Sequence, residues 1–513
     1  MWAKGIVKTN YFTYPSTAAL DRESSLVNTI SSLTLTATIA FIDFNQDFSN
    51  EGMPAKAYLR DVKTLIEVHT AFADLLETRP NAAPVVFGWS FILNIIAIRL
   101  QEVPDPSLKP FIDAVVPDDM AKANSDAQDY ELLALVAEDL AQSALSLDPF
   151  ALLIEAYSIL PTFIIYANIF RYYLQASLPY ISLTENVVTF FYKVIGPFPE
   201  LAEEFFVDPF GDKFYALAAL RFPAALKPML LFAQSLGKNA FSLISNLNTY
   251  MNELPRSFKN YSFVQDTTTI ELNTDIVLLE ANKLDQQSAL ILPQGTKGQT
   301  YSLNNTRYAI WQYDYNGWTY LMRILEFELA ASEYSPNSVD IVDLLTNTLA
   351  TLSELEANSL LDICSRNLTT NDVVEVIFRI LDDSAYLNIN PLAEACVKFA
   401  SVLTLFHPDR VWSYLGRSKL LERNGQKGLM TVLLGSIEIV NGNYDFTISI
   451  LDLVKSLVES VISGILTSQV SRKVQSEILS RFIAHVVGIF ESFAFWAYTD
   501  PRQKVKIANN MRN

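Results

Sequence analysis

Apolar residues recur every three or four positions over most of this chain, which is the period of a helix that buries one face. Val62, Leu65, Ile66 and Phe72, for example, fall on one face of a single predicted helix. Prolines mark many joints between such segments, because a proline stops or kinks a helix. Consecutive helices joined by short loops predict a stacked α-solenoid. The helices are predicted over 18–44, 84–101, 106–115, 128–146, 149–159, 162–178, 183–195 and, with breaks, 211–252.

Helical periodicity returns after about residue 318. Trp318, Leu321 and Leu325 share one face, and Asn390 followed by Pro391 marks a helix start, since proline is tolerated in a first turn. Because no sequence repeat recurs at a fixed period, the predicted fold is all-α, an irregular HEAT- or armadillo-like α-helical solenoid (a superhelix). Its later helices are predicted over 428–441, 444–464 and 467–499.

The stretch 261–318 breaks this pattern, because its apolar residues alternate with a period of two. Thr268, Ile270 and Leu272 stand against Thr269 and Glu271, as expected of a strand. Turn residues separate several such runs, and together they predict a small β-barrel of about sixty residues set into the helical array. The predicted organisation is a first helical part over 1–257, an inserted β domain over 258–318 and a continued helical part over 319–513.

Composition supports a largely buried helical chain. Glycine contributes only 16 of 513 residues, and charged residues make up 18 %, against averages of roughly 7 % and about 25 %. The net charge of −18 and the lack of a basic stripe argue against direct binding of nucleic acid. Two cysteines, Cys364 and Cys396, make no disulfide framework and are interpreted as core residues in a reducing compartment.

Two apolar stretches resemble membrane spans but are interpreted as buried helices. The stretch 85–98 is too short for the roughly twenty apolar residues that a span needs. The stretch 149–170 is interrupted by Glu155, Pro161 and Asn168. The first residues lack the apolar run of a signal peptide. The sequence therefore predicts no transmembrane span and a place in the cytoplasm or nucleus.

A search for chemistry finds no catalytic, cofactor-binding or metal-binding candidate. His69 lies on an apolar helix face, His407 precedes Pro408 in a turn, and His485 lies among apolar residues, so each is interpreted as structural. No two of these histidines or the cysteines have metal-ligand spacing. The segment 292–298 (LPQGTKG) lacks the order of a phosphate-binding loop and is predicted to be a hairpin turn. The chain is therefore predicted not to be an enzyme and to need no cofactor.

Aromatic residues suggest a different use of the helical array. Phe and Tyr together number 55, and many of them, such as residues 190–192, sit at core spacing. Solenoids nevertheless expose apolar grooves between neighbouring helices, where a short hydrophobic peptide can dock. The sequence alone does not indicate which residues line such grooves.

Three passages in this order resemble the large inner-ring scaffold nucleoporins, and within them the member with an SH3-like domain inserted into its solenoid. The first is 217–224 (LAALRFPA) with 230–231 and 235–236. The second is 288–298 (SALILPQGTKG) with 311–318 (WQYDYNGW). The third is 411–418 (VWSYLGRS) with 435–438 (GSIE) and 442–447 (GNYDFT). Members of this family are several times longer, so the chain resembles an internal piece of one.

The resemblance implies a structural role in the inner ring of the nuclear pore complex, at the nuclear envelope. Family members bind short segments of a linker nucleoporin, usually toward their C-terminal region, and their karyopherin-like solenoid can engage phenylalanine-glycine repeats or transport factors. Proline-binding SH3 domains carry an Ala-Leu-Tyr-Asp-Tyr type of run near their first strand. The Tyr-Asp-Tyr here, at residues 313–315, lies on the last strand-like run. Polyproline binding is therefore not implied.

Two alternative functions stay open at this point. One is a soluble karyopherin-like nuclear transport receptor, for which the β insert would be atypical. The other is a solenoid that takes part in trafficking at a membrane or regulates the activity of an enzyme.

Overall fold

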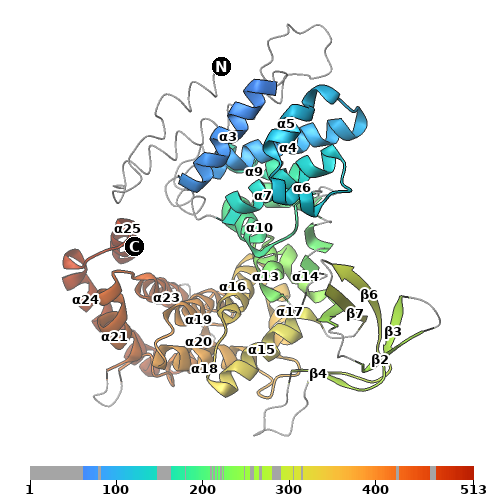
Figure 1. The fold of residues 1–513 in the computed structure, drawn as a ribbon. Helices are drawn as coiled ribbons and strands as arrows, with labels where there is room; N and C mark the ends of the chain where they lie inside the picture. Colours follow the sequence, from blue (N-terminus) through green and yellow to red (C-terminus); the bar gives the residue numbers. More distant parts are fainter. Residues whose placement is uncertain are drawn as a thin grey trace. The chain divides into compact units, whose positions relative to one another are not determined.

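The computed structural model describes most of the chain from residue 62 onward (Figure 1). The helices predicted over 18–44 and 149–159 lie outside the described residues. The chain forms two compact units, Met1–Ala218 and Ala219–Asn513. The described residues are 62–78, 83–146, 163–178, 181–207, parts of 211–247, 249–254, 259–264, 268–279, 290–303, 306–312, 316–422, 427–462 and 470–512.

Helix α4 (Ala83–Glu102) is the centre of the first unit, and α3, α7 and α9 pack against it. It is apolar all round, as expected of a helix surrounded by others, and every residue from Ala83 to Asn94 is buried. The other described elements are α3 (Val62–Thr78), η4 (Pro106–Leu108), α5 (Lys109–Val115), α6 (Asp118–Ala123), α7 (Asp129–Ser146), α9 (Phe163–Ser177), α10 (Glu185–Phe190), the π-helical η5 (Phe191–Ile195) and α11 (Pro199–Val207).

Some buried polar groups of this unit have local hydrogen-bond partners, whereas both side-chain polar atoms of Asn94 have none. Ser90 Oγ donates to the Phe87 carbonyl at 2.7 Å, and Trp89 Nε1 donates to Nδ1 of His69 at 3.3 Å. Burial lowers the pKa of His69 to about 4, so its ring is neutral and can accept this hydrogen bond. The interpretation of His69 as a core histidine is therefore confirmed. The predicted membrane-like stretch 85–98 lies inside α4, whose apolar window is 78 % buried within the protein.

Helices of the second unit stack in a row, with α13 against α16, α16 against α19, α19 against α23 and α23 against α25. This arrangement is mostly helical and consistent with the predicted α-solenoid. The helices are α13 (Leu226–Gln234), α14 (Asn239–Ser245), α15 (Gly317–Ala331), α16 (Pro336–Thr351), α17 (Glu354–Ser365), α18 (Val373–Tyr386), α19 (Asn390–Leu403), α20 (Pro408–Leu415), α21 (Leu429–Leu433), the π-helical η6 (Leu434–Glu438), α22 (Ile439–Asn441), α23 (Asp445–Ile462), α24 (Arg472–Ser492), η7 (Phe493–Phe495) and α25 (Pro501–Arg512).

Local signals fix several of these boundaries. Helices α16, α19 and α20 each carry a proline in the first turn, where its missing N–H costs nothing. The start predicted at Asn390 and Pro391 is therefore confirmed. Helix α17 begins with a capping box between Ser353 and Glu356, which satisfies free amide groups at its start.

Two antiparallel sheets lie between α14 and α15 along the sequence. One has five strands in the order β1 (Thr249–Glu253), β7 (Thr306–Gln312), β6 (Lys297–Leu303), β3 (Thr269–Leu272) and β2 (Tyr261–Phe263). The other pairs β4 (Ile276–Leu279) with β5 (Leu290–Leu292). The strands predicted within 261–318 are thus present.

Trp311 is the centre of the core of these strands. It is fully buried with Ile270, Leu272 and Leu292. Gly298 lies opposite it on β6, and a Cβ atom there would come within 2.6 Å of the Trp311 ring. A side chain at Gly298 would therefore displace the largest residue of this core.

One expectation for this region was wrong. The helical segment predicted over 211–252 includes residues 249–252, whereas the structure places them in β1. Tyr250 pairs with Trp311 across the antiparallel register of β1 and β7. This pairing joins residues far apart in the sequence, so a local periodicity does not reveal it.

Candidate functional site

The three histidines lie at separate places in the fold, with His69 on α3, His407 before α20 and His485 on α24. His407 immediately precedes α20, and burial lowers its pKa. His485 lies on α24 and is considered below. Among the residues that the structure describes, no group of three or more His, Cys, Asp or Glu side chains could hold a metal ion. Cys364 and Cys396 are fully buried, and burial raises the pKa of both thiols, which makes them unreactive core residues.

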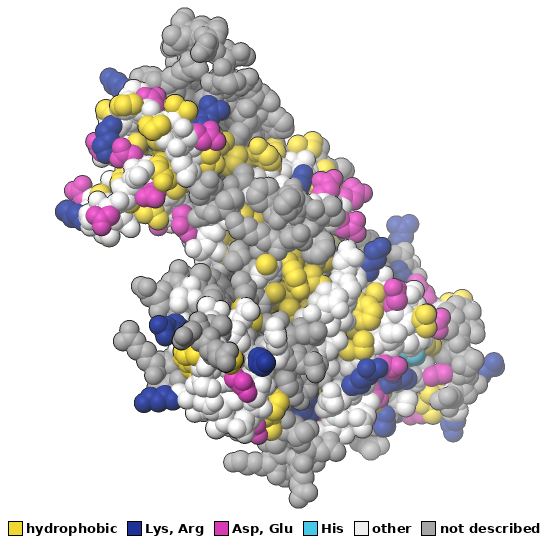
Figure 2. Space-filling model, turned by 90° about the vertical axis from the view of Figure 1, so that its right-hand side faces the viewer, with side chains coloured by type: hydrophobic (Ala, Val, Ile, Leu, Met, Phe, Trp, Pro, Cys, Tyr) yellow, Lys and Arg dark blue, Asp and Glu magenta, His cyan; other side chains and the backbone are white. Residues whose placement is uncertain are grey.

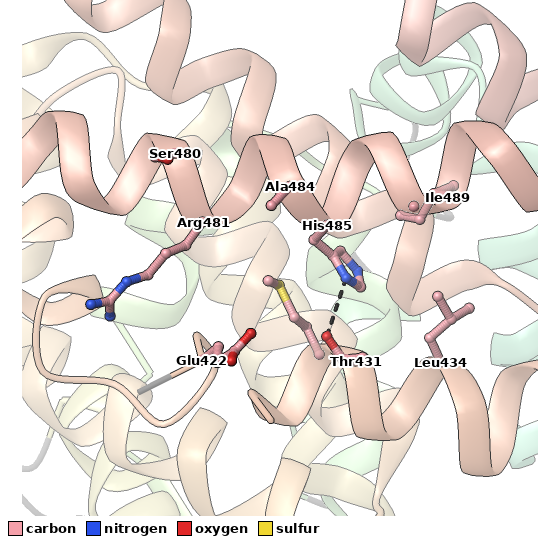
Figure 3. A pocket seen from close by; sticks show the side chains of 10 residues that line it. Glu422, Thr431, Leu434, Ser480, Arg481, Ala484, His485 and Ile489 are labelled. Atoms are coloured by element: carbon pink, nitrogen blue, oxygen red, sulfur yellow. Dashed lines mark hydrogen bonds between the residues drawn. The ribbon is translucent and has the colours of Figure 1, made fainter. Parts of the chain in front are cut away.

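A groove lies between two helical segments of the described part of the second unit. Segments α21 and η6 form one wall and α24 forms the other, and they enclose a volume of about 600 Å³ (Figure 3). Met430, Leu434 and Ile489 are buried on its apolar floor. The full lining is Glu422, Met430, Thr431, Leu434, Ser480, Arg481, Ala484, His485, Gly488 and Ile489.

Small residues keep the α24 wall of the groove low. Ala484 and Gly488 line it one helical turn apart, and a Cβ atom at Gly488 would meet nothing within 4 Å. Gly428 immediately precedes α21, the opposite wall, and a Cβ atom there would lie 2.4 Å from the Leu420 carbonyl oxygen. Glycine at 428 thus lets the incoming chain pass close to Leu420 and sets where α21 starts.

Polar groups line the mouth of the groove. His485 Nδ1 and Thr431 Oγ1 lie 3.3 Å apart across it (Figure 3). Burial lowers the pKa of His485 to about 4, so the ring is neutral at physiological pH. Arg481 pairs with Glu477 on its own helix at 2.5 Å. A general base needs a pKa near the working pH, so this threonine–histidine pair does not resemble an activated nucleophile.

Glu438 holds the π-helical wall in place. It is 1 % exposed and accepts hydrogen bonds from the Thr447 hydroxyl and, at 3.0 Å, from the Thr447 amide. Desolvation by burial raises its pKa to about 7 despite these donors. Because Thr447 lies in the first turn of α23, the contact joins η6 to α23. π-Helical segments are frequent at functional sites, so η6 supports this groove as a candidate functional site.

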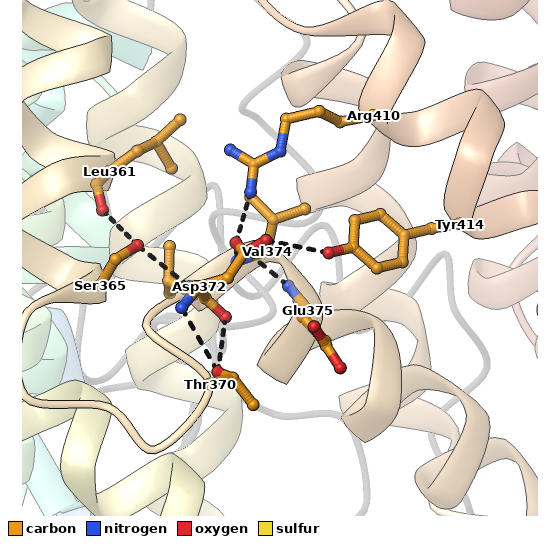
Figure 4. A network of polar contacts seen from close by, with 9 residues as sticks. Leu361, Ser365, Thr370, Asp372, Val374, Glu375, Arg410 and Tyr414 are labelled. Atoms are coloured by element: carbon orange, nitrogen blue, oxygen red, sulfur yellow. Dashed lines mark hydrogen bonds and ion pairs between the residues drawn. The ribbon is translucent and has the colours of Figure 1, made fainter. Parts of the chain in front are cut away.

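A second polar cluster joins α17, α18 and α20 around Asp372 (Figure 4). Its carboxylate caps α18, accepting from the Val374 amide at 2.9 Å. It also pairs with Arg410 and accepts from the Tyr414 hydroxyl at 2.9 Å. Burial and this carboxylate raise the pKa of Tyr414 to about 12. Every group in the cluster has a structural partner, so we interpret it as a link between helices.

Surface charge gives no hint of a polyanion site on the face drawn in Figure 2. Among the side chains described there, Lys and Arg are interspersed with Asp and Glu and do not form a continuous basic surface. Hydrophobic side chains gather in patches between them.

Comparison with known proteins decides the family. Residues 1–261, just over half of the chain, match the family model described as "Nucleoporin Nup188, N-terminal". The chain belongs to the Nup188 nucleoporin family. Residues 308–512 also match the Nup188 model described as "N-terminal subdomain III". The predicted resemblance to the large inner-ring nucleoporins is thereby confirmed, and with it a place at the nuclear pore complex of the nuclear envelope.

Two curated fungal relatives define how much of a Nup188-type protein this chain represents. Nucleoporin NUP188 of Saccharomyces cerevisiae is 24 % identical over 543 residues, covering 94 % of this chain and 31 % of that protein. Nucleoporin nup184 of Schizosaccharomyces pombe is 21 % identical over 541 residues, covering 99 % of this chain and 33 % of that protein. The chain thus spans about one third of the length of these relatives.

Proposed function

We propose that this chain is a structural scaffold segment of the nuclear pore inner ring. It docks short segments of other nucleoporins, including linker segments and phenylalanine-glycine repeats, and so supports nucleocytoplasmic transport. The observation that carries the proposal is membership of the Nup188 family, joined to a helical stack with an apolar groove. The proposed role needs no covalent chemistry, and we expect no turnover of substrate.

The groove beside α24 is the proposed docking place. Its volume of about 600 Å³ falls within the roughly 300–1,000 Å³ typical of ligand sites. The floor of Met430, Leu434 and Ile489 suits one large apolar side chain, and the low wall at Gly488 lets a peptide backbone approach. Arg481 and Glu422 at the mouth can hydrogen-bond that backbone.

We further infer that the strands form an SH3-like β domain inserted into the solenoid. The predicted division into 1–257, 258–318 and 319–513 is kept, with β1 as a strand that the first helical part adds to the sheet. Support comes from the antiparallel strands around Trp311 and from their position between two helical segments. In this proposal the domain is characteristic of one lineage of nucleoporins and does not bind polyproline.

Filling the groove tests the docking proposal. Thr431→Trp places an indole in the groove, whereas Val432→Trp on the next residue adds the same indole to a surface position outside the lining. We expect T431W to lower binding of nucleoporin segments at least tenfold in pull-downs with the purified chain, and V432W to leave it unchanged. Equal binding by both variants would place docking elsewhere.

A further inference from the structure

Glu438 is the only aspartate or glutamate that is buried among the residues that the structure describes. Its carboxylate accepts hydrogen bonds from the hydroxyl and amide of Thr447 and from the amide of Phe446. The charged group that acts on it from α23 is Asp445, which is also negative, and no lysine or arginine of the described chain is paired with it. Burying a carboxylate without a cation is costly, so the two protonation states of Glu438 differ in their effect on the fold around it.

The main chain and the side chain of Glu438 hold the same turn of the chain. Its carbonyl accepts from the Gly442 amide at 2.8 Å, and its carboxylate binds the first turn of α23 at Thr447. Gly442 has a φ of 70°, a left-handed conformation that lets the chain turn between η6 and α23. The position of η6 relative to α23 therefore depends on the carboxyl group of Glu438.

The opposite end of η6 forms part of the groove floor. Leu434 and Ile489 lie on the two walls of the groove (Figure 3), and both are buried in one cluster with Tyr444. The Ile439 amide donates to the Leu434 carbonyl, a hydrogen bond between residues five apart that spans η6. A shift of η6 at Glu438 is therefore carried to Leu434 and changes the width of the groove at its apolar floor.

The neutral form of Glu438 is the one that stabilises this part of the fold. Burial raises its pKa from 4.5 to about 7, and Asp445 acts in the same direction, against the hydrogen bonds from Thr447 and Phe446. The stability from the retained proton is fully present below pH 4.5 and is lost as the pH rises through about 7. Segments α21, η6 and α22 carry no other titratable side chain. Tyr444 stays neutral in this range, because burial and Glu438 raise its pKa above 10.0.

We propose that Glu438 is a positioning residue for the groove, and that loss of its proton loosens the η6 wall and weakens docking there. When the carboxyl group is protonated, η6 is held in one position, so less ordering is left for the binding step. This control rests on the docking function proposed for the groove and adds a proton-dependent regulation of that site.

Hydrogen exchange of the η6 amides measures the loosening without any docking partner. Glu438→Gln keeps an acceptor for Thr447 but cannot ionise. After correction for the intrinsic exchange rate, the ratio of opening in the wild-type chain to opening in E438Q should rise about tenfold from pH 6 to pH 8. The ratio cancels contributions from His485 and Arg481 on the α24 wall, because both proteins contain them. A ratio that does not depend on pH would overturn the proposal.

Thr447→Val separates control by the proton from a contact that is merely structural. Valine has nearly the shape of threonine, but it lacks the hydroxyl that favours the ionised carboxylate. The midpoint of the exchange profile should therefore move to higher pH in T447V, and an unchanged midpoint would contradict the proposal. Glu333→Gln, at an exposed position after α15, is the control variant and should keep the wild-type profile.

Docking is then measured with a fluorescent, N-acetylated phenylalanine-glycine repeat peptide as the probe. Its binding to the wild-type chain should weaken severalfold from pH 6 to pH 8, whereas its binding to E438Q should stay nearly constant. T431W, whose groove is filled, should bind at least tenfold more weakly at both pH values. Wild-type binding that does not depend on pH would overturn control by Glu438 and leave the docking function intact. Absence of wild-type binding at both pH values would refute docking of such repeats and this control together.

Discussion

Helix α4 in the first unit and helix α24 in the second are both long and rich in apolar residues, yet 78 % of the apolar window of α4 is buried and only 17 % of that of α24. Along α4, every residue from Ala83 to Asn94 is buried, including the polar Ser90 and Asn94. Along α24, burial is confined to Gln475, Ile478, Phe482 and Ile489. Two helices of similar composition thus differ greatly in burial, so composition alone does not determine how much of a helix is covered.

Replacing one phenylalanine by alanine in each helix should give the largest difference in stability between the two helices. Phe87 is fully buried and packs edge-on against Tyr173 and Phe190, with ring centroids 6.0 and 5.5 Å away. Phe87→Ala should destabilise the first unit by ~3–5 kcal/mol. Phe490→Ala on α24 removes an exposed ring and should change stability by less than ~0.5 kcal/mol. Urea unfolding of the two variants measures both, and equal shifts of the midpoint would contradict the contrast in burial.

A buried imidazole beside α4 should make the first unit sensitive to acid. The pKa of His69 is about 4 in the folded chain against 6.5 for the free group, so the unfolded state takes up the proton first as pH falls. The contribution of neutral His69 to the free energy of unfolding is fully present above pH 6.5. It is lost progressively down to about pH 4, and the loss is about 2 kcal/mol at pH 5.

A variant isolates this effect from other titrating groups. His69→Gln keeps an acceptor for Trp89 Nε1 but removes the titration, so its stability should depend less on pH between 6.5 and 4. His485 on α24 is less buried and His485→Gln should flatten the profile less. Identical profiles for the wild-type chain and H69Q would show that this imidazole does not titrate as described.

Alanine substitution of two glycines should give the smallest changes in stability. The two sites differ in whether there is free space for a Cβ atom. Gly488→Ala on α24 meets no atom within 4 Å and should stabilise the helix by ~0.5–1 kcal/mol. Gly298→Ala in β6 meets Trp311 at 2.6 Å and should destabilise the chain by ~1–3 kcal/mol. Thermal unfolding of the two variants should therefore shift in opposite directions.

Strong periodicity predicted most of the helical fold. The expected helices over 84–101 and 128–146 correspond closely to α4 and α7. The helix start predicted at Asn390 and Pro391 is the start of α19. The short, polar helices α6 and α25 were missed because they carry few apolar residues, although Pro501 offered a start signal for α25. Strand β1 was missed because its pairing with β7 is non-local.

The groove could not be predicted because it depends on which helix faces meet. Met430 and Ile489 lie far apart in the sequence, and each is an ordinary apolar position in its own helix. The π-helical turn of η6 changes which side chains face α24, and a single helical period carries no signal for it. Gly488, a glycine within a predicted helix, is a local hint of the low wall of the groove.

The most direct test of the scaffold role is retention at the nuclear rim. A fluorescent fusion of the full-length protein that contains this chain is followed in permeabilised cells before and after washing. The account predicts a rim signal that survives washing and recovers slowly after photobleaching. Loss of the rim signal on washing would contradict a scaffold and indicate a soluble transport receptor.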